Sequence, residues 1–310
     1  MQLAIPLPSR LKSNCSASLL ACATLLLTVA QHGALAQTPG AKPTTTATTT
    51  SDDALRRAAQ NPVASLISVP LQNNTNFNVG ANDRTQNLIN IQPVIPFNVS
   101  KDWMVVVRII QPIIWQPLPK APTGGEFGIG DMSPTFFLGL RKPGKLIWGA
   151  GPVFVIPTAT NDILGQGKFS IGPSIVALVQ PQHWTVGALV NNVWSVAGSG
   201  GRPTVNQLLL QCILNYNLKK GWYLVSAPII TANWRASSGN IWTVPVGGGV
   251  GRIMRLGSQP LNLQVQVFGN AVHPAGTSPW GMRLQITLLY PKKPAQLTQP
   301  SPPTNPRSDQ

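Results

Sequence analysis

Charged side chains are scarce in this sequence. They make up 10% of its 310 residues, whereas soluble globular proteins carry about 25%. Asn and Gln supply much of the polarity instead, and amide side chains suit the water-filled interior of a membrane β-barrel. The alternative is a soluble, secreted protein with a β-sandwich fold.

The few charges are unbalanced, with 23 Lys and Arg against 8 Asp and Glu and a formal charge of +15. Removal of a leader that contains Arg10 and Lys12 would lower the charge to +13. The basic residues are scattered, mostly at turns, and form neither a basic helix nor a zinc-binding pattern. We therefore expect no nucleic-acid partner. At the rims or in the lumen of a barrel, basic residues would favour anionic lipid headgroups or anionic solutes.

Cysteine is nearly absent. Of the 3 cysteines, Cys15 and Cys22 lie in the leader, and Cys212 lies on the apolar side of an alternating segment. One remaining thiol cannot form an internal disulfide or a metal cluster. We predict no metal site and no cofactor, and interpret Cys212 as a small lipid-facing residue.

The components of a catalytic site are equally sparse. Acyl chemistry needs a nucleophile, a base and an orienting group, and the chain after the leader has only His183 and His273. Ser278 is near His273 in sequence, but there is no G-x-S-x-G motif. We predict a protein that is not an enzyme and has no catalytic residues. A barrel with a lipid-modifying or structural role is the alternative.

Long apolar runs are missing beyond the leader, because Pro, Gly or polar residues interrupt each one. The leader itself has a basic start, an apolar run over 17–30 and an A-x-A site at 34–36. That run is short for a membrane helix and typical of a signal peptide. We predict a signal peptide over 1–36.

The segments around the main domain have a different composition. Residues 37–51 are rich in Thr and Pro and are expected to be disordered, as is the Pro-rich periplasmic tail 291–310. Ser51 is predicted to cap a short helix over 52–62 that Asn61-Pro62 ends. This helix is expected either at the periplasmic mouth or folded inward as a plug.

A hairpin over 205–234 indicates the fold of the domain that spans 63–290. Leu208, Leu210 and Cys212 alternate with Gln207 and Gln211, which is a strand with one apolar and one amide face. A tight turn over 219–221 leads to a second long strand. Strands of this length, amide on one side, are typical of outer-membrane barrels.

The same pattern recurs along the chain. We predict an all-β, transmembrane, antiparallel up-and-down β-barrel of about twelve strands, near 66–79, 85–98, 103–115, 128–141, 146–157, 168–180, 183–196, 204–218, 221–234, 241–254, 260–272 and 281–290. Prolines inside these ranges predict local bulges. The bulge is expected above all in 221–234, where the alternation weakens near Ser226 and Pro228.

Connections and tryptophans support a membrane barrel. Short turns alternate with mostly longer, Gly- and Ser-rich loops, as periplasmic turns alternate with external loops. Nearly every tryptophan lies at a predicted strand end, where the aromatic girdles of membrane barrels lie. The predicted girdle consists of Trp103, Trp115, Trp148, Trp184, Trp194, Trp222, Trp234, Trp242 and Trp280.

Strand parity separates lipid-facing from lumen-facing side chains. An arginine at the centre of the lipid face would cost about 2–4 kcal/mol, so charges within strands should face inward. Arg108, Asp131 and Arg283 would either orient a solute or form an ion pair that braces the lumen. The lumen-lining candidates are Arg108, Asp131, Arg283, Gln285, Gln264, Gln266, Asn74, Asn76, Gln92 and Gln211.

Several stretches resemble a known family. They are LISVPLQNNTNFNVG (66–80), DRTQNLINIQPVIPF (83–97), GIGDMSPTFFL (128–138), KLIWGAGPVFVIPTAT (145–160) and WTVPVGGGVGRI (242–253). They are similar to bacterial outer-membrane barrel transporters related to the meta-pathway phenol-degradation proteins, often mislabelled "neuromedin U". The resemblance covers about 60–290.

The resemblance implies a location in the bacterial outer membrane and a channel or transporter for small, hydrophobic or aromatic molecules. The partners expected there are outer-membrane lipids, lipopolysaccharide, the barrel-assembly machinery and a small-molecule solute. The resemblance carries over no catalytic residue and names no substrate.

Overall fold

The computed structural model describes residues 46–118 and 121–291. The predicted signal peptide, residues 37–45 and the tail from 292 lie outside the described residues. None of the helices in the described part is long and apolar enough to cross a membrane.

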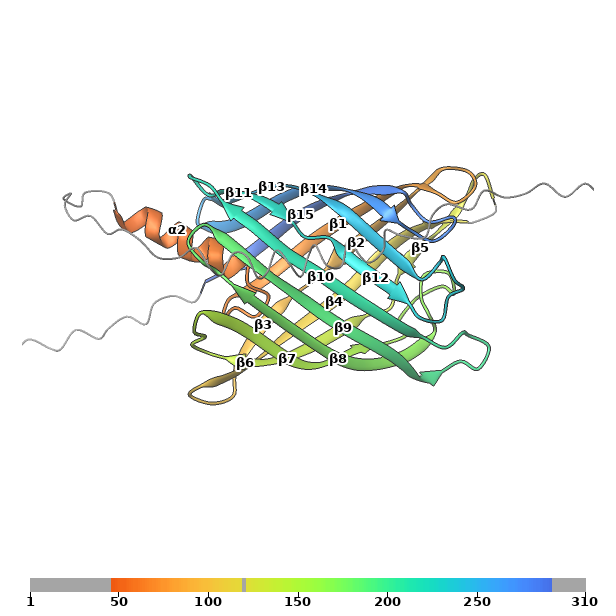
Figure 1. Ribbon diagram of the computed structural model, residues 1–310, viewed down its shortest axis with the longest axis horizontal. Helices are drawn as coiled ribbons and strands as arrows, with labels where there is room; N and C mark the ends of the chain where they lie inside the picture. The colour runs from red at the N-terminus through yellow and green to blue at the C-terminus, as the bar shows by residue number, and fades with distance from the viewer. Residues whose placement is uncertain (1–45, 119–120, 292–310) are drawn as a thin grey trace, which may run out of the picture.

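Fifteen strand segments form one antiparallel sheet that closes on itself (Figure 1). Consecutive strands pair around the wall, β9 pairs with β10, and the first strand pairs with the last from Ile67↔Tyr290 to Phe77↔Trp280. The segments are β1 (Ile67–Val79), β2 (Arg84–Ile91), β3 (Val94–Asn98), β4 (Trp103–Pro117), β5 (Gly125–Ile129), β6 (Ser133–Leu140), β7 (Leu146–Val155), β8 (Lys168–Val179), β9 (Trp184–Gly198), β10 (Asn206–Asn217), β11 (Trp222–Ser226), β12 (Ile229–Asn233), β13 (Trp242–Leu256), β14 (Gln259–Val272) and β15 (Trp280–Tyr290).

These fifteen segments build twelve barrel strands, because β2–β3, β5–β6 and β11–β12 are each one strand in two pieces. The predicted twelve-stranded antiparallel barrel is therefore confirmed. The ninth strand is interrupted where its alternation weakens, since Ala227 and Pro228 separate β11 from β12. The bulge expected there is wrong, because the register against β10 and against β13 is the same on both sides of the interruption. Prolines 96, 112, 152 and 173 stay inside strands without a register shift. A predicted proline bulge does occur in β13, where the register against β14 shifts between Val244 and Pro245.

The two faces of the wall differ as strand parity predicts. In β15, Leu284 and Ile286 are 43% and 39% exposed, whereas Arg283 just before them and Thr287 just after them are 8% and 3% exposed. The first pair faces away from the barrel axis and the second pair faces the interior. An apolar outer surface with a polar inner one is the arrangement of a barrel in lipid.

One end of the barrel carries the helix and the shorter connections, and we call it the helix end. Its turns are 99–102, 141–145, 180–183, 218–221 and 257–258. In the turn predicted over 219–221, Lys220 and Gly221 have φ of 56° and 77°. Positive φ values at consecutive residues are typical of the tight turns that connect hairpin strands. The opposite loop end has the short turn 80–83 and the longer loops 118–124, 156–167, 199–205, 234–241 and 273–279.

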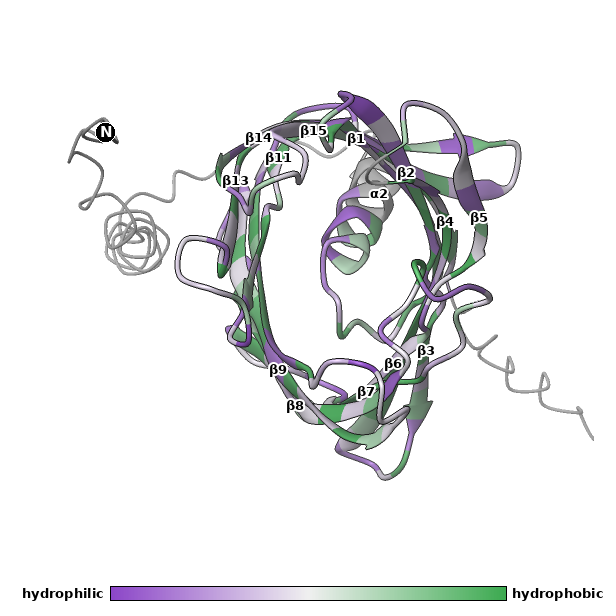
Figure 2. Cartoon of the chain, turned by 90° about the vertical axis from the view of Figure 1, so that its right-hand side faces the viewer, coloured by the Kyte–Doolittle hydropathy of each residue, from purple (hydrophilic) through white to green (hydrophobic). Residues whose placement is uncertain are grey.

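The helix α2 (Thr46–Ala59) lies at the helix end and projects into the ring of strands (Figure 2). It begins earlier than predicted, so Ser51 lies inside the helix and not at its N-cap. No Gly or Pro occurs between Pro43 and Pro62, and without such a residue the helix continues past the expected cap.

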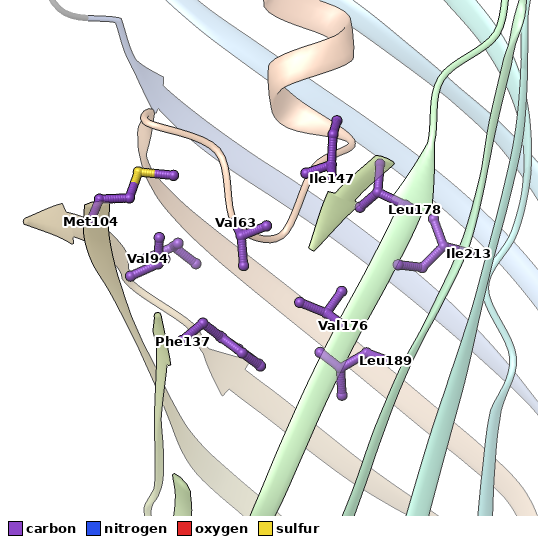
Figure 3. Packing of buried hydrophobic residues seen from close by; sticks show 10 residues of the cluster. Val63, Val94, Met104, Phe137, Ile147, Val176, Leu178, Leu189 and Ile213 are labelled. Carbon is purple, nitrogen blue, oxygen red and sulfur yellow. The ribbon is translucent and has the colours of Figure 1, made fainter. Parts of the chain in front are cut away.

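An apolar cluster follows the helix inside the barrel (Figure 3). Val63 is 2% exposed and lies among inward-facing side chains of seven strands. These side chains are Val94, Met104, Val106, Phe137, Ile147, Val176, Leu178, Leu189 and Ile213. The segment after α2 thus supplies the centre of a core that the wall alone leaves open.

A glycine-rich stretch lets β13 pack closely against its neighbours. A Cβ at Gly251 would lie 2.2 Å from the Tyr223 ring, and one at Gly249 would lie 1.8 Å from the Val265 carbonyl oxygen. Tyr223 is 1% exposed, and its hydroxyl donates to Asn262 Oδ1 at 2.5 Å. These glycines permit the close packing of β13 against its neighbours.

Replacing Gly249 by Ala should therefore destabilise the barrel. The new methyl group collides with a backbone oxygen of the paired strand, and overpacking of this kind costs about 1–3 kcal/mol. The temperature at which the compact gel band converts to the unfolded band should fall. Gly269→Ala is the matched control, since a Cβ there meets nothing within 4 Å. Equal conversion temperatures for both variants would contradict this packing.

Candidate functional site: the barrel lumen

Three cavities lie inside the ring of strands. The main cavity has a volume of about 690 Å³ and is lined by both barrel walls and by loop residues Ala236, Asn240 and Ala275. The rim cavity has about 370 Å³ and lies beside the loop 273–279. The plug cavity has about 140 Å³ and lies against residues 58–64, which follow and end α2.

Five polar residues line the plug cavity together with one of the other two. Gln72, Gln92, Arg108 and Gln211 line both the plug cavity and the main cavity. Arg283 lines both the plug cavity and the rim cavity. We call these five residues the waist. All but Gln72 belong to the lumen-lining residues predicted from the sequence.

The two waist arginines are held by neutral groups. Arg108 Nη2 donates to Gln92 Oε1 at 2.8 Å. Arg283 Nε donates to Asn74 Oδ1 at 3.0 Å, and its Nη1 donates to the Ala227 carbonyl at 2.8 Å. The Arg283 guanidinium also lies over the Phe268 ring, 5.0 Å from its centre, which stabilises the cation further.

The break between β11 and β12 is stabilised from inside the lumen. Ala227 donates its N–H to Gln266 Oε1 at 3.1 Å, and its carbonyl accepts the Arg283 hydrogen bond. Gln266 in turn donates to Gln264 Oε1 at 3.2 Å. The predicted lumen residues Gln266 and Arg283 thus bind the Ala227 N–H and carbonyl, at the point where Pro228 interrupts the hydrogen bonds between strands.

The remaining predicted amides form smaller contacts around the lumen. Gln285 lines the plug cavity and donates to Thr287 Oγ1 at 3.0 Å. Asn74 and Asn76 line the rim cavity, and Asn76 donates to Gln86 Oε1 at 2.7 Å. Solute contact by these residues stays a prediction.

Asp131 is not part of this group. Its Oδ1 accepts from the Ala159 N–H at 3.2 Å and its Oδ2 from the Gln166 N–H at 2.6 Å. The carboxylate therefore orders the loop 156–167, and it lines none of the three cavities. The expected ion pair with Arg108 or Arg283 is wrong, because Asp131 falls in the gap between β5 and β6, where strand parity no longer applies.

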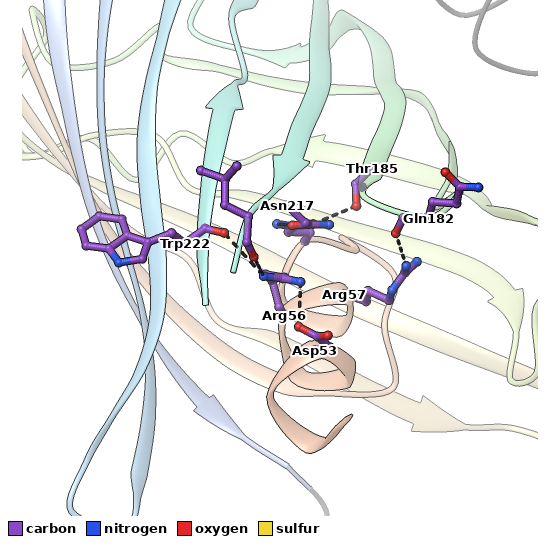
Figure 4. A network of polar contacts seen from close by, with 9 residues as sticks. Asp53, Arg56, Arg57, Gln182, Thr185, Asn217 and Trp222 are labelled. Atoms are coloured by element: carbon purple, nitrogen blue, oxygen red, sulfur yellow. Dashed lines mark hydrogen bonds and ion pairs between the residues drawn. The ribbon is translucent and has the colours of Figure 1, made fainter. Parts of the chain in front are cut away.

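The helix is fastened to the turns at the helix end by two arginines (Figure 4). Arg56 Nη1 donates to the carbonyls of Leu218 and Trp222 at 2.8 and 3.4 Å. Arg57 donates to the carbonyls of Gln180, at 2.6 Å, and Gln182. Two adjacent turns of the barrel are thereby tied to one turn of the helix.

Gln60 continues this attachment inside the mouth. It donates to Asn217 Oδ1 at 2.9 Å and accepts from Thr185 Oγ1 at 2.8 Å. Leu55, Ala64 and Leu66 pack with inward-facing apolar groups of the wall. We call residues 53–66 the plug, because polar and apolar contacts together hold them within the helix end of the barrel.

The tryptophans lie in two groups, at the two ends of the strands. Trp103, Trp148, Trp184 and Trp222 are at the helix end, and the other five are at the loop end. Trp103 contacts Trp148 edge to face, with ring centres 6.2 Å apart. Contact of both groups with membrane interfaces stays a prediction.

The enzymatic alternative has no support in the geometry of its candidate residues. The Ser278 hydroxyl is hydrogen-bonded to the backbone carbonyls of Phe77 and Trp280, at 2.5 Å each, and not to His273. The His273 Nδ1 lies 3.3 Å from Thr277 Oγ1 and 3.1 Å from the Pro274 carbonyl. In the described ranges, no three His, Cys, Asp or Glu side chains are grouped to hold a metal.

Comparisons with known proteins agree with this barrel. No protein-family model and no curated protein sequence matches the chain. The fold is similar to the COG4313 outer membrane channel from Pseudomonas putida F1, with a TM-score of 0.56 and 15% identity over 74% of this chain and 97% of that chain. Outer membrane phospholipase A from Escherichia coli is a more distant match, with a TM-score of 0.41 and 12% identity over 72% of this chain and 90% of that chain.

At 15% identity, the likeness to the channel shows the fold alone. The fold shown is a closed, all-β barrel of the outer-membrane type.

Sequence reasoning did not place the plug. The signal was present in Arg56 and Arg57, which follow a short apolar face of α2, but their carbonyl partners lie in turns more than 120 residues away. Tyr223 was also missed, because its hydroxyl partner Asn262 comes from a strand that does not pair with β11.

Replacing Val63 by Asp should release the plug. The carboxylate would replace one of the ten buried apolar side chains of this cluster, and an unpaired buried charge costs about 3–5 kcal/mol. The open fraction of single proteins in planar bilayers should rise by about tenfold or more. Ala54→Asp is the control, since Ala54 is exposed on the same helix. Identical current records for the two variants would show that the plug does not limit the passage.

Proposed function

We propose that this protein is an outer-membrane channel for small hydrophobic or aromatic molecules. The observation that carries the proposal is a run of adjoining cavities inside a closed barrel. The main cavity alone, about 690 Å³, is within the range of small-molecule binding sites, about 300–1,000 Å³.

The lining of the main cavity supports a solute of low polarity. Apolar side chains from β4, β7, β9 and β10 face it, among them Ile110, Val153, Val155, Val193 and Leu209. Amides such as Asn90 and Asn191 are interspersed, and Arg108 is its one charged residue among those described. A mixed wall of this kind binds apolar bodies and leaves a few groups to orient them.

The proposed location is the outer membrane of a bacterium, in keeping with the fold of the Pseudomonas channel and the apolar outer face. The helix end would face the periplasm, because barrels of this type have short periplasmic turns and longer external loops. Lipopolysaccharide would then contact the loop end, and the barrel-assembly machinery would insert the protein. The relation to the phenol-degradation transporters belongs to the same proposal.

The plug would hold the resting channel closed on its periplasmic side. Three described residues, Arg56, Arg57 and Gln60, donate the hydrogen bonds that attach it to the turns and the wall. The neutral Gln60 bond contributes about 0.5–1.5 kcal/mol, and each bond from a charged arginine about 1.5–3 kcal/mol. A solute entering from the loop end would meet the main cavity first and the plug only after passing the waist.

Uptake by whole cells tests the function. An intact lipopolysaccharide surface excludes neutral aromatic dyes such as N-phenyl-1-naphthylamine, which fluoresce on reaching phospholipid. Cells that produce the protein should become fluorescent several times faster than cells without it. Ser133→Trp should slow this rise, because Ser133 lines the main cavity and an indole would fill part of it.

Ser237→Trp provides the matched control, since Ser237 is exposed in the loop 234–241. It should leave the rate of the wild type unchanged. Equal rates in producing and non-producing cells would contradict the channel. Release of fatty acids from phospholipid that is lost in His273→Ala would favour the lipid-modifying alternative instead.

A further inference from the structure

The waist arginines lack the partner that buried cations usually have. Neither Asp nor Glu lines any of the three cavities in the described chain. The ion pairs of the described residues are Arg56–Asp53 and Arg202–Asp162, both away from the waist. Buried charges in proteins are normally paired with an opposite charge. Here two cations face one lumen with only neutral acceptors.

The arginines also retain unused donors. A guanidinium has five N–H groups, and within the described chain Arg108 uses one of them, toward Gln92. Arg283 uses two, toward Asn74 and Ala227. Both side chains line the plug cavity of about 140 Å³, which holds only a handful of water molecules. Donors of both guanidinium groups thus face one small cavity.

The surroundings of Arg108 define what such an anion would carry. Arg108 is the boundary between the small polar plug cavity and the larger main cavity. On the main-cavity side the inner face is mixed. Thr135 lies directly across from Arg108 on the paired strand, and apolar side chains line the same cavity, Ile110 on β4 and the valines of β7 among them. An anionic head at the waist would therefore place its body beside these apolar side chains.

We propose that the waist binds the carboxylate of a small amphipathic acid whose apolar or aromatic body lies in the main cavity. Guanidinium groups match carboxylates through paired, charge-assisted hydrogen bonds. The bound acid would supply the negative charge that the lumen lacks. This inference rests on the proposed function, because it names the solute class of the same passage.

Calorimetric titration of the purified full-length protein in a non-ionic detergent tests the site. Sodium benzoate is the probe, and benzyl alcohol is its neutral counterpart with the same ring. Benzoate should bind at least about tenfold more tightly than benzyl alcohol, since hydrogen bonds to a charged group are the stronger ones. Acetate and chloride should bind more weakly than benzoate, because they bring no apolar body.

Substitutions locate the binding. Arg108→Gln and Arg283→Gln should each weaken benzoate binding by about tenfold. Arg108→Lys should weaken it less, because lysine keeps the positive charge and loses only the paired hydrogen bonds of the guanidinium group. Arg235→Gln should have no effect, because Arg235 is exposed in a loop. Heat-dependent gel migration shows that each variant is folded. If a Gln variant does not fold, the Lys variant at the same position is used in its place, and its benzoate affinity should be severalfold lower than that of the wild type.

Unchanged benzoate affinity in the arginine variants would overturn the proposal. Chloride that binds as tightly as benzoate and displaces it would also overturn the proposal, because the site would then recognise any small anion without regard to its apolar body. Binding in detergent requires no transport, so its failure is distinct from a failure of dye uptake by cells. Dye uptake without benzoate binding would support the proposed channel and contradict the proposed carboxylate site.

Discussion

The interior of a twelve-stranded ring is too wide for its own wall to fill, and the rest of the structure depends on how that space is occupied. At the helix end the plug occupies it. Val63 is 2% exposed and packs among apolar side chains of opposite walls, so a segment from outside the ring becomes the centre of its core. Toward the loop end, the described residues leave the main cavity of about 690 Å³. One barrel thus has a closed half and an open half.

The boundary between these halves determines the electrostatics of the lumen. In a barrel of the outer-membrane type, a charge in the strands is tolerated on the inner face and costly on the outer one. Arg108 and Arg283 are both on the inner face, where Gln92 and Asn74 accept from them. Neutral acceptors orient a guanidinium without neutralising it. The passage is therefore electropositive at the point where it narrows toward the plug.

Period-two alternation was sufficient to predict the strands and their faces, because successive side chains of each strand alternate between an apolar outer face and a more polar inner one. It failed where the period is interrupted. Asp131 lies in such an interruption and turns toward a loop, and Ser51 lies inside a helix that no Gly or Pro stops. The sequence left the helix either at the periplasmic mouth or folded inward as a plug, because Arg56 and Gln60 bind backbone and side chains that only barrel closure brings together. The local alternation of residues therefore predicts the strands of the barrel wall, whereas the position of the plug depends on contacts that form only when the barrel closes.

Hydrogen–deuterium exchange of the full-length protein in lipid nanodiscs tests most directly whether residues 53–66 occupy the barrel. The amides of Gln60, Asn61 and Ala64 are bonded to carbonyls within the plug, and its side chains are tied to the wall. The account predicts exchange over 53–66 that is slower by orders of magnitude than in a free peptide of the same sequence, comparable with the strands β10 and β11. Exchange as fast as in the free peptide would show that the segment lies outside the barrel and would contradict the account.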